Sequence, residues 1–529
     1  MNSDALPNPM PVFHGTAQNA SYREQQVPRY KGNPLIEALP DILSAEDAVN
    51  LLAYYPPRDP HASELPAEIR QHLLLDVLHF FQPLPFHIDY EQRVSRLVRD
   101  GYVGRNPIIR DHWRDIDRRV ESILEAGGIP MCSSNVNGFA MLGIPGVGKT
   151  TVNERVLLTY PQVINHRSYH GRPFHGIQIV WLKITCPHDG SIKALCLQFF
   201  ADIDGLLQTT YYRDFAGGGR RTVDELIQAM ARVAAIHCLG LLVVDEIQCL
   251  NQAKSGGAER MLNFFLQLMN TLGLPVVLVG TYAAMQILNR ELRQVRRNCG
   301  MGDFIWDRMA NDEVFRMFAE ALWRYQYTKI QVPLSKELND VLYEESAGIV
   351  DFAVKLFLLA QVRAISGGKE EITSTIIRSV ARDSLRLAQP ALNAIRTGDM
   401  RAVATMRDLH PIDIQSAVQQ IRKSALLERL APGTRIVSDI NAAAAHQPTT
   451  ATSALAPTTA TNHQSAPSPN PWATKKSPRS KGKGAPSKCL LVRVVDAGLA
   501  KGKSAHDALA EAGLIKPLFA FQSTPDPSR

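Results

Sequence analysis

The strongest constraint on the fold comes from one glycine-rich stretch, Gly143-Ile144-Pro145-Gly146-Val147-Gly148-Lys149-Thr150-Thr151. It matches the phosphate-binding loop pattern GxxxxGK[ST] at every fixed position. In this pattern the glycines let backbone N–H groups close around phosphates, the lysine reaches the β- and γ-oxygens, and the hydroxyl residue binds Mg²⁺. We therefore expect the chain to bind ATP with Mg²⁺. The candidate nucleotide-binding residues are Gly143, Pro145, Gly146, Val147, Gly148, Lys149, Thr150 and Thr151.

The segments on either side of this loop support a strand–loop–helix unit. Residues 138–142 form a short apolar run typical of a buried strand. Residues 151–160 can continue as a helix whose N-terminus points at the phosphates. These flanks disfavour a chance match in an ordinary glycine-rich turn.

A second acidic motif indicates hydrolysis as well as binding. The apolar run 241–244 reads as a buried parallel strand and ends in Asp245 and Glu246. Asp245 is placed to hold the Mg²⁺ shell, together with Thr150, and Glu246 to orient and deprotonate the attacking water. The alternative is an ordinary strand that ends in a solvated Asp-Glu pair.

A third apolar run follows one amphipathic helix. Residues 257–272 predict the helix and residues 275–281 the strand, which gives the β-α-β order of a parallel sheet. Thr281 stands at the end of that strand, where a hydroxyl could hydrogen-bond the γ-phosphate or the lytic water. Threonine after a strand is common, so the residue type alone decides little.

Composition is that of an ordinary globular chain. Apolar residues make up 45% and charged residues 21% of the 529 residues. The first residues carry neither a basic n-region nor an apolar h-region, and no apolar run is long enough to span a bilayer. The seven cysteines lack metal-ligand or disulfide spacing. We expect a cytoplasmic protein with reduced thiols, no zinc site and no membrane partner.

The positive charge is unevenly distributed. The net charge is +7, and residues 440–495 contain no Asp or Glu while six Lys and Arg crowd into 475–488. Such a cluster favours polyanions through counterion release, although a solubilising linker reads the same way. The stretch is also rich in Ala, Thr, Ser and Pro, which predicts a disordered tether.

The pattern along the chain divides it into six parts. Helical patches are expected at 45–54, 65–81 and 89–100, a further strand at 177–184, and helices at 313–325, 335–346, 351–365 and 370–387. The predicted fold class is α/β, a P-loop core with a parallel sheet flanked by helices, plus a small all-helical lid. The predicted parts are an N-terminal docking region (1–105), a nucleotide-binding core (106–311), the lid (312–390), a helical extension (391–440), a disordered basic tether (441–489) and a partner-binding tail (490–529) that could alternatively form a minimal helix-turn-helix.

With these motifs in this order, the chain resembles an AAA+ ATPase. Within that class it resembles the longer TnsC branch of the TnsC and TniB type, the ATP-dependent regulators of DNA transposition. The resemblance covers roughly 102–387, and three stretches carry it: 180–196 with its Cys-Pro-x-Asp-Gly-Ser segment, 275–281, and the Gly-Tyr-x-x-Arg-Asn-Pro element at 101–107.

The resemblance implies an ATP-loaded ring or helical filament, hexamer-like or heptameric, that wraps duplex DNA without sequence preference. It implies that the N-terminal region contacts a target selector of the TnsD or TniQ type and the tail contacts the transposase. It also makes Thr281 the first sensor. The arginine finger, which acts on a neighbouring subunit's nucleotide, would be Arg296 or Arg297, with Arg293 on the same stretch, and a solvated basic face is the alternative for each.

DNA contacts are expected at two helix N-termini, where backbone donors and the helix dipole favour phosphates. Lys193 lies in the first turn of a helix starting near residue 191. Arg220 and Arg221 lead into Thr222, which opens a capping box. By position, Lys193 and Thr222 look similar to DNA-contacting residues of related TnsC proteins; the alternative is a pair of solvent-facing helix starts.

One feature departs from the AAA+ pattern. Many lids carry a Gly-x-x-Arg second sensor, whereas here Gly348 is followed by Lys355, which could face either the nucleotide or solvent. The alternative function is a signalling or initiator-like ATPase switch that acts mainly on protein partners. A GTPase is disfavoured because no Asn-Lys-x-Asp segment occurs, and small-molecule kinases seldom need a lid followed by a tethered tail.

Overall fold

A computed structural model describes residues 15–124, 138–216, 221–253, 257–285, 288, 303–399, 402–403 and 413–430. Contacts divide the chain into two units, 1–446 and 447–529, and every described residue belongs to the first. The predicted basic tether and partner-binding tail lie outside the described residues.

The centre of the first unit is a five-stranded sheet of order β5-β6-β7-β2-β8, in which every neighbouring pair is parallel. Apolar runs rich in branched side chains form its strands, as expected for a sheet covered on both faces. This confirms the predicted α/β fold. The strands are β2 (Phe139–Gly143), β5 (Trp181–Thr185), β6 (Leu241–Asp245), β7 (Val276–Gly280) and β8 (Phe304–Trp306).

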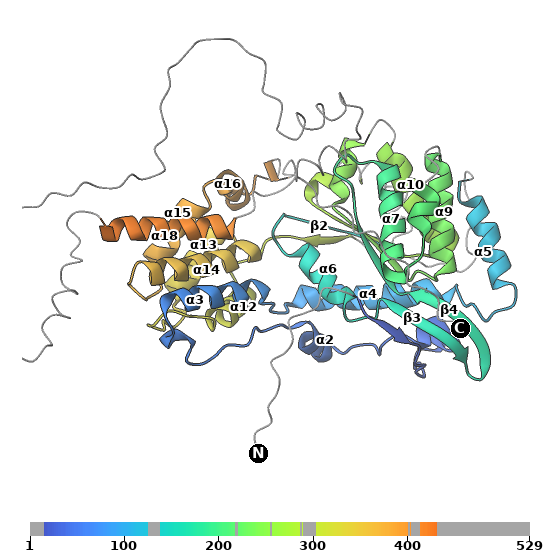
Figure 1. The fold of residues 1–529 in the computed structure, drawn as a ribbon, viewed down its shortest axis with the longest axis horizontal. Helices are drawn as coiled ribbons and strands as arrows, with labels where there is room; N and C mark the ends of the chain where they lie inside the picture. The colour runs from blue at the N-terminus through green and yellow to red at the C-terminus, as the bar shows by residue number, and fades with distance from the viewer. Residues whose placement is uncertain are drawn as a thin grey trace, which may run out of the picture. The chain divides into compact units, whose positions relative to one another are not determined.

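Two hydrophobic clusters cover the two faces of this sheet. Alternate residues of each strand point to opposite faces, so Val243 joins one cluster and Val244 the other. Figure 1 shows α7, α9 and α10 grouped on one side of the sheet and α4 and α6 on the other. The helices of the two layers are α4 (Pro85–Val103) and α6 (Lys149–Leu157), opposite α5 (His112–Glu121), α7 (Ile192–Leu207), α9 (Val223–Ile236) and α10 (Gly257–Leu272), with the short α8 (Tyr211–Ala216).

A second sheet corrects one prediction. The expected single strand at 177–184 is two strands, β4 (Arg172–Ile179) and β5, which separate at Val180 and belong to different sheets. β4 pairs antiparallel with β3 (Val163–Tyr169), and β3 pairs parallel with β1 (Ala17–Asn19). The apolar run continues through Val180 without a polar break, so periodicity alone could not show where the chain changes sheets.

The N-terminal segment packs into the same hydrophobic cluster as α6 and the helical C-terminal part. The predicted helical patches are present with shifted ends. The predicted helix at 89–100 is longer at both ends, because Pro85 and Phe86 extend it at the start. The elements here are η1 (Pro28–Tyr30), α1 (Pro34–Glu37), α2 (Ala45–Leu52), η2 (Ala62–Glu64), α3 (Ala67–Leu73) and η3 (Leu74–His79), with η4 (Ser122–Leu124) after α5.

After β8 the described chain is helical, as predicted. Some boundaries differ, most of all for the helix expected at 370–387, which ends at Ser384 and begins only at Ser374, because Thr373 caps it by accepting from the Ile376 N–H at 3.3 Å. The helices are α12 (Glu313–Trp323), α13 (Lys336–Ser346), α14 (Val350–Ser366), α15 (Ser374–Ser384), α16 (Gln389–Thr397) and α18 (Ile414–Leu430). None of the described helices is long and apolar enough to cross a bilayer.

Candidate nucleotide-binding site

The glycine-rich loop joins the end of β2 to the start of α6. Gly146 and Gly148 have φ values of 81° and 105°, a left-handed backbone that glycine adopts without steric cost. A Cβ on Gly143 would lie 2.1 Å from the carbonyl oxygen of Trp306 on the adjacent strand β8. The glycines of the motif are therefore required by backbone conformation and by close strand packing.

Lys149 is buried at the first position of α6. Its Nζ donates to the carbonyl oxygens of Gly143 at 3.0 Å and Ile144 at 2.8 Å. The loop's own carbonyls therefore hold the ammonium beside the loop. This is where a phosphate-binding lysine has to stand in order to reach β- and γ-oxygens.

Thr150 and Asp245 meet at the carboxyl edge of the sheet. The Thr150 hydroxyl donates to Asp245 Oδ2 at 3.1 Å, and Asp245 is buried. A hydroxyl and a carboxylate are hard oxygen ligands, which suit Mg²⁺ bound by one or two protein groups plus substrate phosphates. The described residues contain no group of three or more His, Cys, Asp or Glu that could hold a metal ion by themselves. The pair therefore fits a metal that arrives with a nucleotide.

Glu246 follows in a left-handed conformation, with φ of 57°, which is uncommon for a residue with a side chain. Its backbone N–H donates to Asp245 Oδ1 at 2.9 Å, and its carboxylate accepts from Gln248 Nε2. Gln248 in turn accepts from the backbone N–H of Thr281 at 3.0 Å. One amide thus connects the ends of β6 and β7, a role that the sequence did not indicate.

Thr281 directly follows β7 and is buried. Among the described residues its hydroxyl has no hydrogen-bond partner. Buried polar atoms are normally paired, and an exception in a native structure calls for an explanation. A ligand oxygen at this edge of the sheet would supply the missing partner.

Sequence reasoning did not single out Lys183 as a site residue. It stands in the middle of β5, and its Nζ lies 2.6 Å from Glu154 Oε1 and 3.4 Å from Asp245 Oδ2. The available signal was one lysine inside an otherwise apolar strand that neighbours the Asp-Glu strand.

The helical C-terminal part contacts the glycine-rich loop. At the start of α14, the Asp351 N–H donates to the Gly146 carbonyl oxygen at 3.3 Å. Lys355, one turn later, is paired with Asp351 Oδ2 at 2.6 Å and is largely buried. The structure therefore places Lys355 in an ion pair beside the loop and not on a solvent-facing surface.

Residues 137–288 match the AAA domain family. The chain contains an AAA-type P-loop ATPase domain. No curated protein matches the chain. Among solved structures, it is similar to the ORC2 protein of Aeropyrum pernix (10% identity, TM-score 0.31, 63% of this chain and 98% of that one). It is also similar to the Aeropyrum pernix ORC1 protein in complex with DNA (14%, 0.31, 63% and 86%) and to a Walker-type ATPase of Pyrococcus abyssi (15%, 0.28, 60% and 90%).

The candidate finger arginines and one candidate DNA-contacting arginine lie outside the described residues. After β7, the 3-10 helix η6 (Tyr282–Ala284) is present where the arginine-bearing helix was expected to begin. Arg293, Arg296 and Arg297 lie outside the described residues, and so does Arg220.

The two predicted DNA-contacting helix starts lie at the same edge of the AAA sheet as the nucleotide motifs. Tyr211, which begins α8 four residues after the end of α7, and His237, just after α9, are joined by a 2.9 Å hydrogen bond, so α7 and α9 end near each other. They pack side by side (Figure 1) and therefore start together, α7 close behind the carboxyl end of β5. Lys193 is exposed in the first turn of α7, and Thr222 is exposed at the start of α9.

The predicted capping box at Thr222 is confirmed. Thr222 Oγ1 accepts from the Glu225 N–H at 3.3 Å, and the Glu225 carboxylate accepts from the Thr222 N–H at 2.7 Å. Arg221 has local partners: its guanidinium lies 4.9 Å from the ring centroid of Phe215 and donates to the Asp214 carbonyl oxygen at 3.3 Å. It is therefore less available to a ligand than the sequence suggested.

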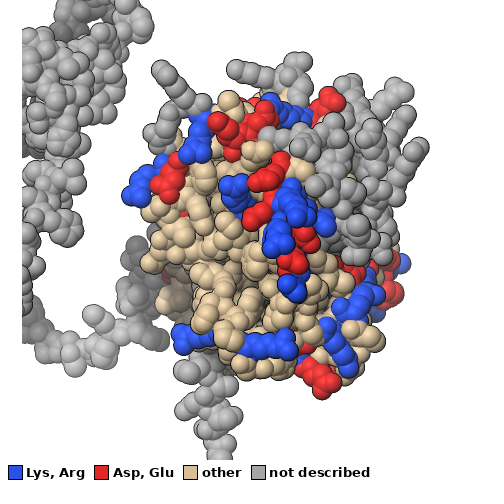
Figure 2. Space-filling view, turned by 90° about the vertical axis from the view of Figure 1, so that its right-hand side faces the viewer, with Lys and Arg blue, Asp and Glu red and all other residues tan. Residues whose placement is uncertain are grey.

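Charged side chains are mixed in sign on the face seen in Figure 2, where Asp and Glu stand among Lys and Arg. The signs also alternate around α5, where Arg114 pairs with Asp111, the residue before the helix, and Arg118 pairs with Asp115. This face offers no continuous basic field to a polyanion. On this face, DNA contact by the described residues would have to be local.

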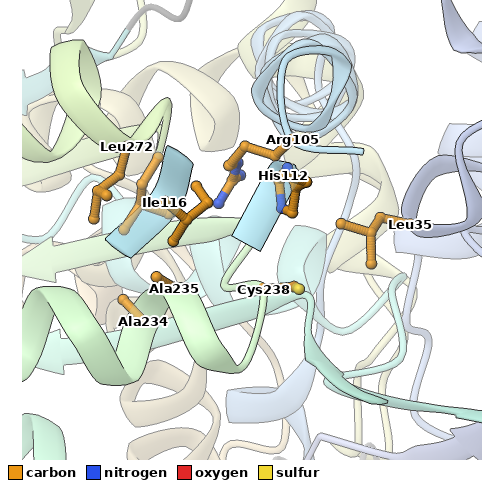
Figure 3. Close-up of a pocket in the computed structure, with 9 residues that line it drawn as sticks. Leu35, Arg105, His112, Ile116, Ala234, Ala235, Cys238 and Leu272 are labelled. Carbon is orange, nitrogen blue, oxygen red and sulfur yellow. The ribbon is translucent and has the colours of Figure 1, made fainter. Parts of the chain in front are cut away.

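The Gly-Tyr-x-x-Arg-Asn-Pro element has a structural use. Arg105 Nε donates to the Gly101 carbonyl oxygen at 2.7 Å and Nη1 to that of Leu239 at 2.6 Å, which ties the end of α4 to the chain before β6. Figure 3 shows Arg105 beside His112 and Cys238 in a small cavity of about 10 Å³. Burial, with Arg105 nearby, lowers the pKa of His112 to about 4. Such a volume accommodates about one water molecule, so the cavity is no ligand site.

Proposed function

We propose that this chain is an ATP-dependent DNA-binding regulator of transposition. It would assemble on duplex DNA as an ATP-loaded ring or filament, link a target selector of the TnsD or TniQ type to the transposase, and hydrolyse ATP to disassemble. The observation that carries the ATPase part is the convergence of Lys149, the Thr150–Asp245 pair, Glu246 and the Thr281 hydroxyl, which has no partner among the described residues, at one sheet edge.

The chemistry assigned to the chain's residues follows from this arrangement. Lys149 would release its two carbonyl partners and donate to phosphate oxygens. Thr150 and Asp245 would hold Mg²⁺, which when bound offsets charge on the phosphates. The Glu246 carboxylate would accept the proton of the attacking water, and Gln248 would set the direction of that carboxylate. Thr281 would donate its hydroxyl proton to a γ-phosphate oxygen or orient the water.

The DNA part of the proposal depends on helix starts. Lys193 and Thr222 are exposed at two parallel helix N-termini on the nucleotide side of the sheet, where backbone donors and the helix dipole favour phosphate. Their position at the same edge as Asp245 would let nucleotide state and DNA contact influence each other. The transposition part rests on the sequence resemblance, chiefly on 180–196, which spans β5 and the start of α7.

The first test is binding of the full chain to fluorescent duplexes of two unrelated sequences, with a non-hydrolysable ATP analogue, with ADP or without nucleotide. Binding only in the ATP-like state, cooperative and indifferent to sequence, supports the proposal. Equal and weak binding in all three states contradicts it. Lys149→Ala should lose nucleotide and DNA binding together, whereas Glu246→Gln should bind ATP and remain on DNA.

A mixing experiment identifies the finger residue. Arg296→Ala and Arg297→Ala are each compared for ATP binding and hydrolysis. The finger variant should bind ATP normally, fail to hydrolyse it, and regain activity when mixed with a Glu246→Gln subunit that keeps the arginine. Removal of residues 490–529 should abolish transposase recruitment and spare ATPase activity.

A switch that acts mainly on protein partners is the second candidate. The mixed charge on the face in Figure 2 and the local partners of Arg221 favour it. If Lys193→Ala combined with Thr222→Ala leaves DNA affinity unchanged in the ATP-like state, this second function replaces the first.

A further inference from the structure

Lys183 is placed unusually for a residue of a buried strand. It is the third residue of β5, between the apolar Leu182 and Ile184, and its side chain is only 18% exposed. A lysine at such a position is retained only where an anion compensates its charge. Two carboxylates do so: Glu154 Oε1 at 2.6 Å and Asp245 Oδ2 at 3.4 Å.

Two groups contact the same oxygen atom of Asp245. Asp245 Oδ2 accepts the Thr150 hydroxyl at 3.1 Å and also faces the Lys183 ammonium. Thr150 and Asp245 are the two residues that would hold Mg²⁺ in the proposed function. An ammonium therefore already compensates the carboxylate that the metal needs.

Glu154, the second carboxylate beside Lys183, offers the ammonium an alternative partner. Glu154 lies on α6, four residues after Thr150, so the two side chains share one helix face. The shorter of the two Lys183 contacts is the one to Glu154, whose side chain is 37% exposed. The ammonium can therefore leave Asp245 without losing a carboxylate partner.

We propose that Lys183 is a resident countercation that competes with Mg²⁺ for Asp245, and that Glu154 takes over the ammonium when the metal binds. This inference rests on the proposed nucleotide site and adds a positioning pair to it. Before the metal binds, the Lys183 ammonium compensates the charge of the Asp245 carboxylate. It thereby raises the metal concentration at which the site fills. Because the pair joins β5 to α6, metal loading also alters the contact between that strand and the phosphate-loop helix.

The consequence is a pair of substitutions with opposite effects. Lys183→Met removes the competing charge and should tighten metal binding by about tenfold or more, since about tenfold is the effect of a charge pair at this separation in bulk water and burial strengthens it. Glu154→Gln leaves Lys183 with Asp245 alone and should weaken metal binding several-fold. In the Lys183→Met background, Glu154→Gln should change little, because Glu154 acts through the ammonium.

The experiment is a titration of Mn²⁺ against the full chain with a non-hydrolysable ATP analogue, followed by electron paramagnetic resonance of free Mn²⁺. It is run on the wild type, both single variants and the double variant. Lys336→Met and Glu337→Gln, at the exposed start of α13, make the same charge changes far from the motif and should leave Mn²⁺ affinity unchanged. Thermal unfolding of each variant shows whether it is folded.

Each outcome has a distinct meaning. If the wild type binds no Mn²⁺ with the analogue, the proposed nucleotide function fails and the inference falls with it. If the wild type binds and Lys183→Met is unchanged or weaker, the inference alone is overturned. If Lys183→Met does not fold, Glu154→Gln still tests the inference, because Glu154 is only partly buried. Unchanged or tighter Mn²⁺ binding by Glu154→Gln would contradict the proposal that Glu154 accepts the ammonium when the metal binds. Additive effects in the double variant would also overturn it.

Discussion

Two polar regions of the molecule are built in opposite ways. Where the N-terminal segment meets the helical C-terminal part, Arg70 is almost fully buried and Glu370 receives its guanidinium through two 2.7 Å hydrogen bonds. At the nucleotide motif, the buried Thr281 hydroxyl has no partner in the described residues. We call the first region, around Arg70 and Glu370, closed, because the chain itself supplies the partners of its buried charge. We call the second, around Thr281, incomplete, because a ligand can supply the hydrogen-bond partner that its hydroxyl lacks in the part of the chain that the structure describes.

A shared feature sharpens this comparison. Glu246 and Glu370 both adopt the left-handed conformation, with φ of 57° and 55°. Glu370 pairs with a buried arginine, which holds the pKa of its carboxyl below the usual range, while Glu246 contacts the neutral amide of Gln248. Backbone strain therefore does not by itself mark a functional residue in this chain. The partner of the carboxylate distinguishes the two.

The largest expected effect is on the closed region. Arg70→Ala would remove the Arg70 donor from the carbonyl oxygens of Leu65 and Tyr327 and from the Glu370 carboxylate, which would keep the Lys329 N–H at 3.3 Å. Breaking a buried pair in this way costs about 3–5 kcal/mol. Urea unfolding should show this loss, while folded Arg70→Ala keeps its affinity for an ATP analogue.

The control for Arg70 is Arg316→Ala. Arg316 is exposed on α12 and pairs there with Glu313 and Glu320, so its loss should cost less than about 1 kcal/mol. Equal effects of the two substitutions would remove the distinction between a closed region and an ordinary surface.

The next effect concerns the incomplete region. Thr281→Val removes a buried hydroxyl that has no partner in the described part of the chain, so the free energy of unfolding should stay the same or rise. Hydrolysis should fall about tenfold to a hundredfold, or about 1.4–2.7 kcal/mol of activation free energy. Thr328→Val is the matched control, because the Thr328 hydroxyl is buried and donates to the Ile330 carbonyl oxygen at 3.0 Å. That control should lose about 1 kcal/mol of stability and no activity.

A pH effect is expected from His87, which is buried near β8. Burial, and then the charge of Arg155, lower the pKa of His87 to about 3, while in the unfolded chain it is about 6.5. The unfolded state therefore binds the extra proton first, and stability falls as pH drops from about 6.5 towards 3, by up to about 1.4 kcal/mol per pH unit. Above that range this histidine contributes no pH dependence.

Unfolding measured across this pH range, in the wild type and in His87→Gln, tests the effect. His87 Nδ1 accepts from the Leu84 N–H at 3.0 Å, and glutamine at this helix position can accept in the same way. The variant should have a flatter profile between pH 6.5 and 4. Parallel profiles would assign the acid sensitivity to other groups.

The smallest effect compares two helix caps. Thr222→Ala and Thr373→Ala each remove a hydroxyl that accepts a backbone N–H, and each should cost about 1 kcal/mol of stability. Only Thr222→Ala should also weaken DNA binding in the ATP-like state, because Thr222 opens α9 on the nucleotide side of the sheet. If both or neither change DNA affinity, the helix start of α9 is not the contact.

Several parts of the fold followed directly from local patterns. The helix α10 begins and ends at the predicted residues, and β2, β6 and β7 lie within one residue of their apolar runs. These elements are amphipathic or wholly buried and have clear boundaries in glycine, proline or charge, so the pattern was sufficient. The strand predicted at 177–184 failed because its two halves are equally apolar but join different sheets.

The site divides in the same way. The residues of the phosphate loop and of the Asp-Glu strand are read from their spacing, because each position of those motifs has a mechanical task. Lys183 and Gln248 were missed because their meaning depends on neighbours distant in sequence: Glu154 and Asp245 for one, Thr281 for the other. A single lysine within β5 and a single glutamine shortly after β6 do not form a motif with a recognisable spacing.

The sequence by itself determined the strand–loop–helix unit, the parallel order of the core and the chemistry that its motifs can perform. Only the tertiary structure decided which side chains share an oxygen atom, which hydroxyl has no partner within the described ranges, and that α7 and α9 start at one edge. The physical reason is that hydrophobic periodicity and turn chemistry act over a few residues, whereas compensation of a buried charge depends on whichever element packs against it.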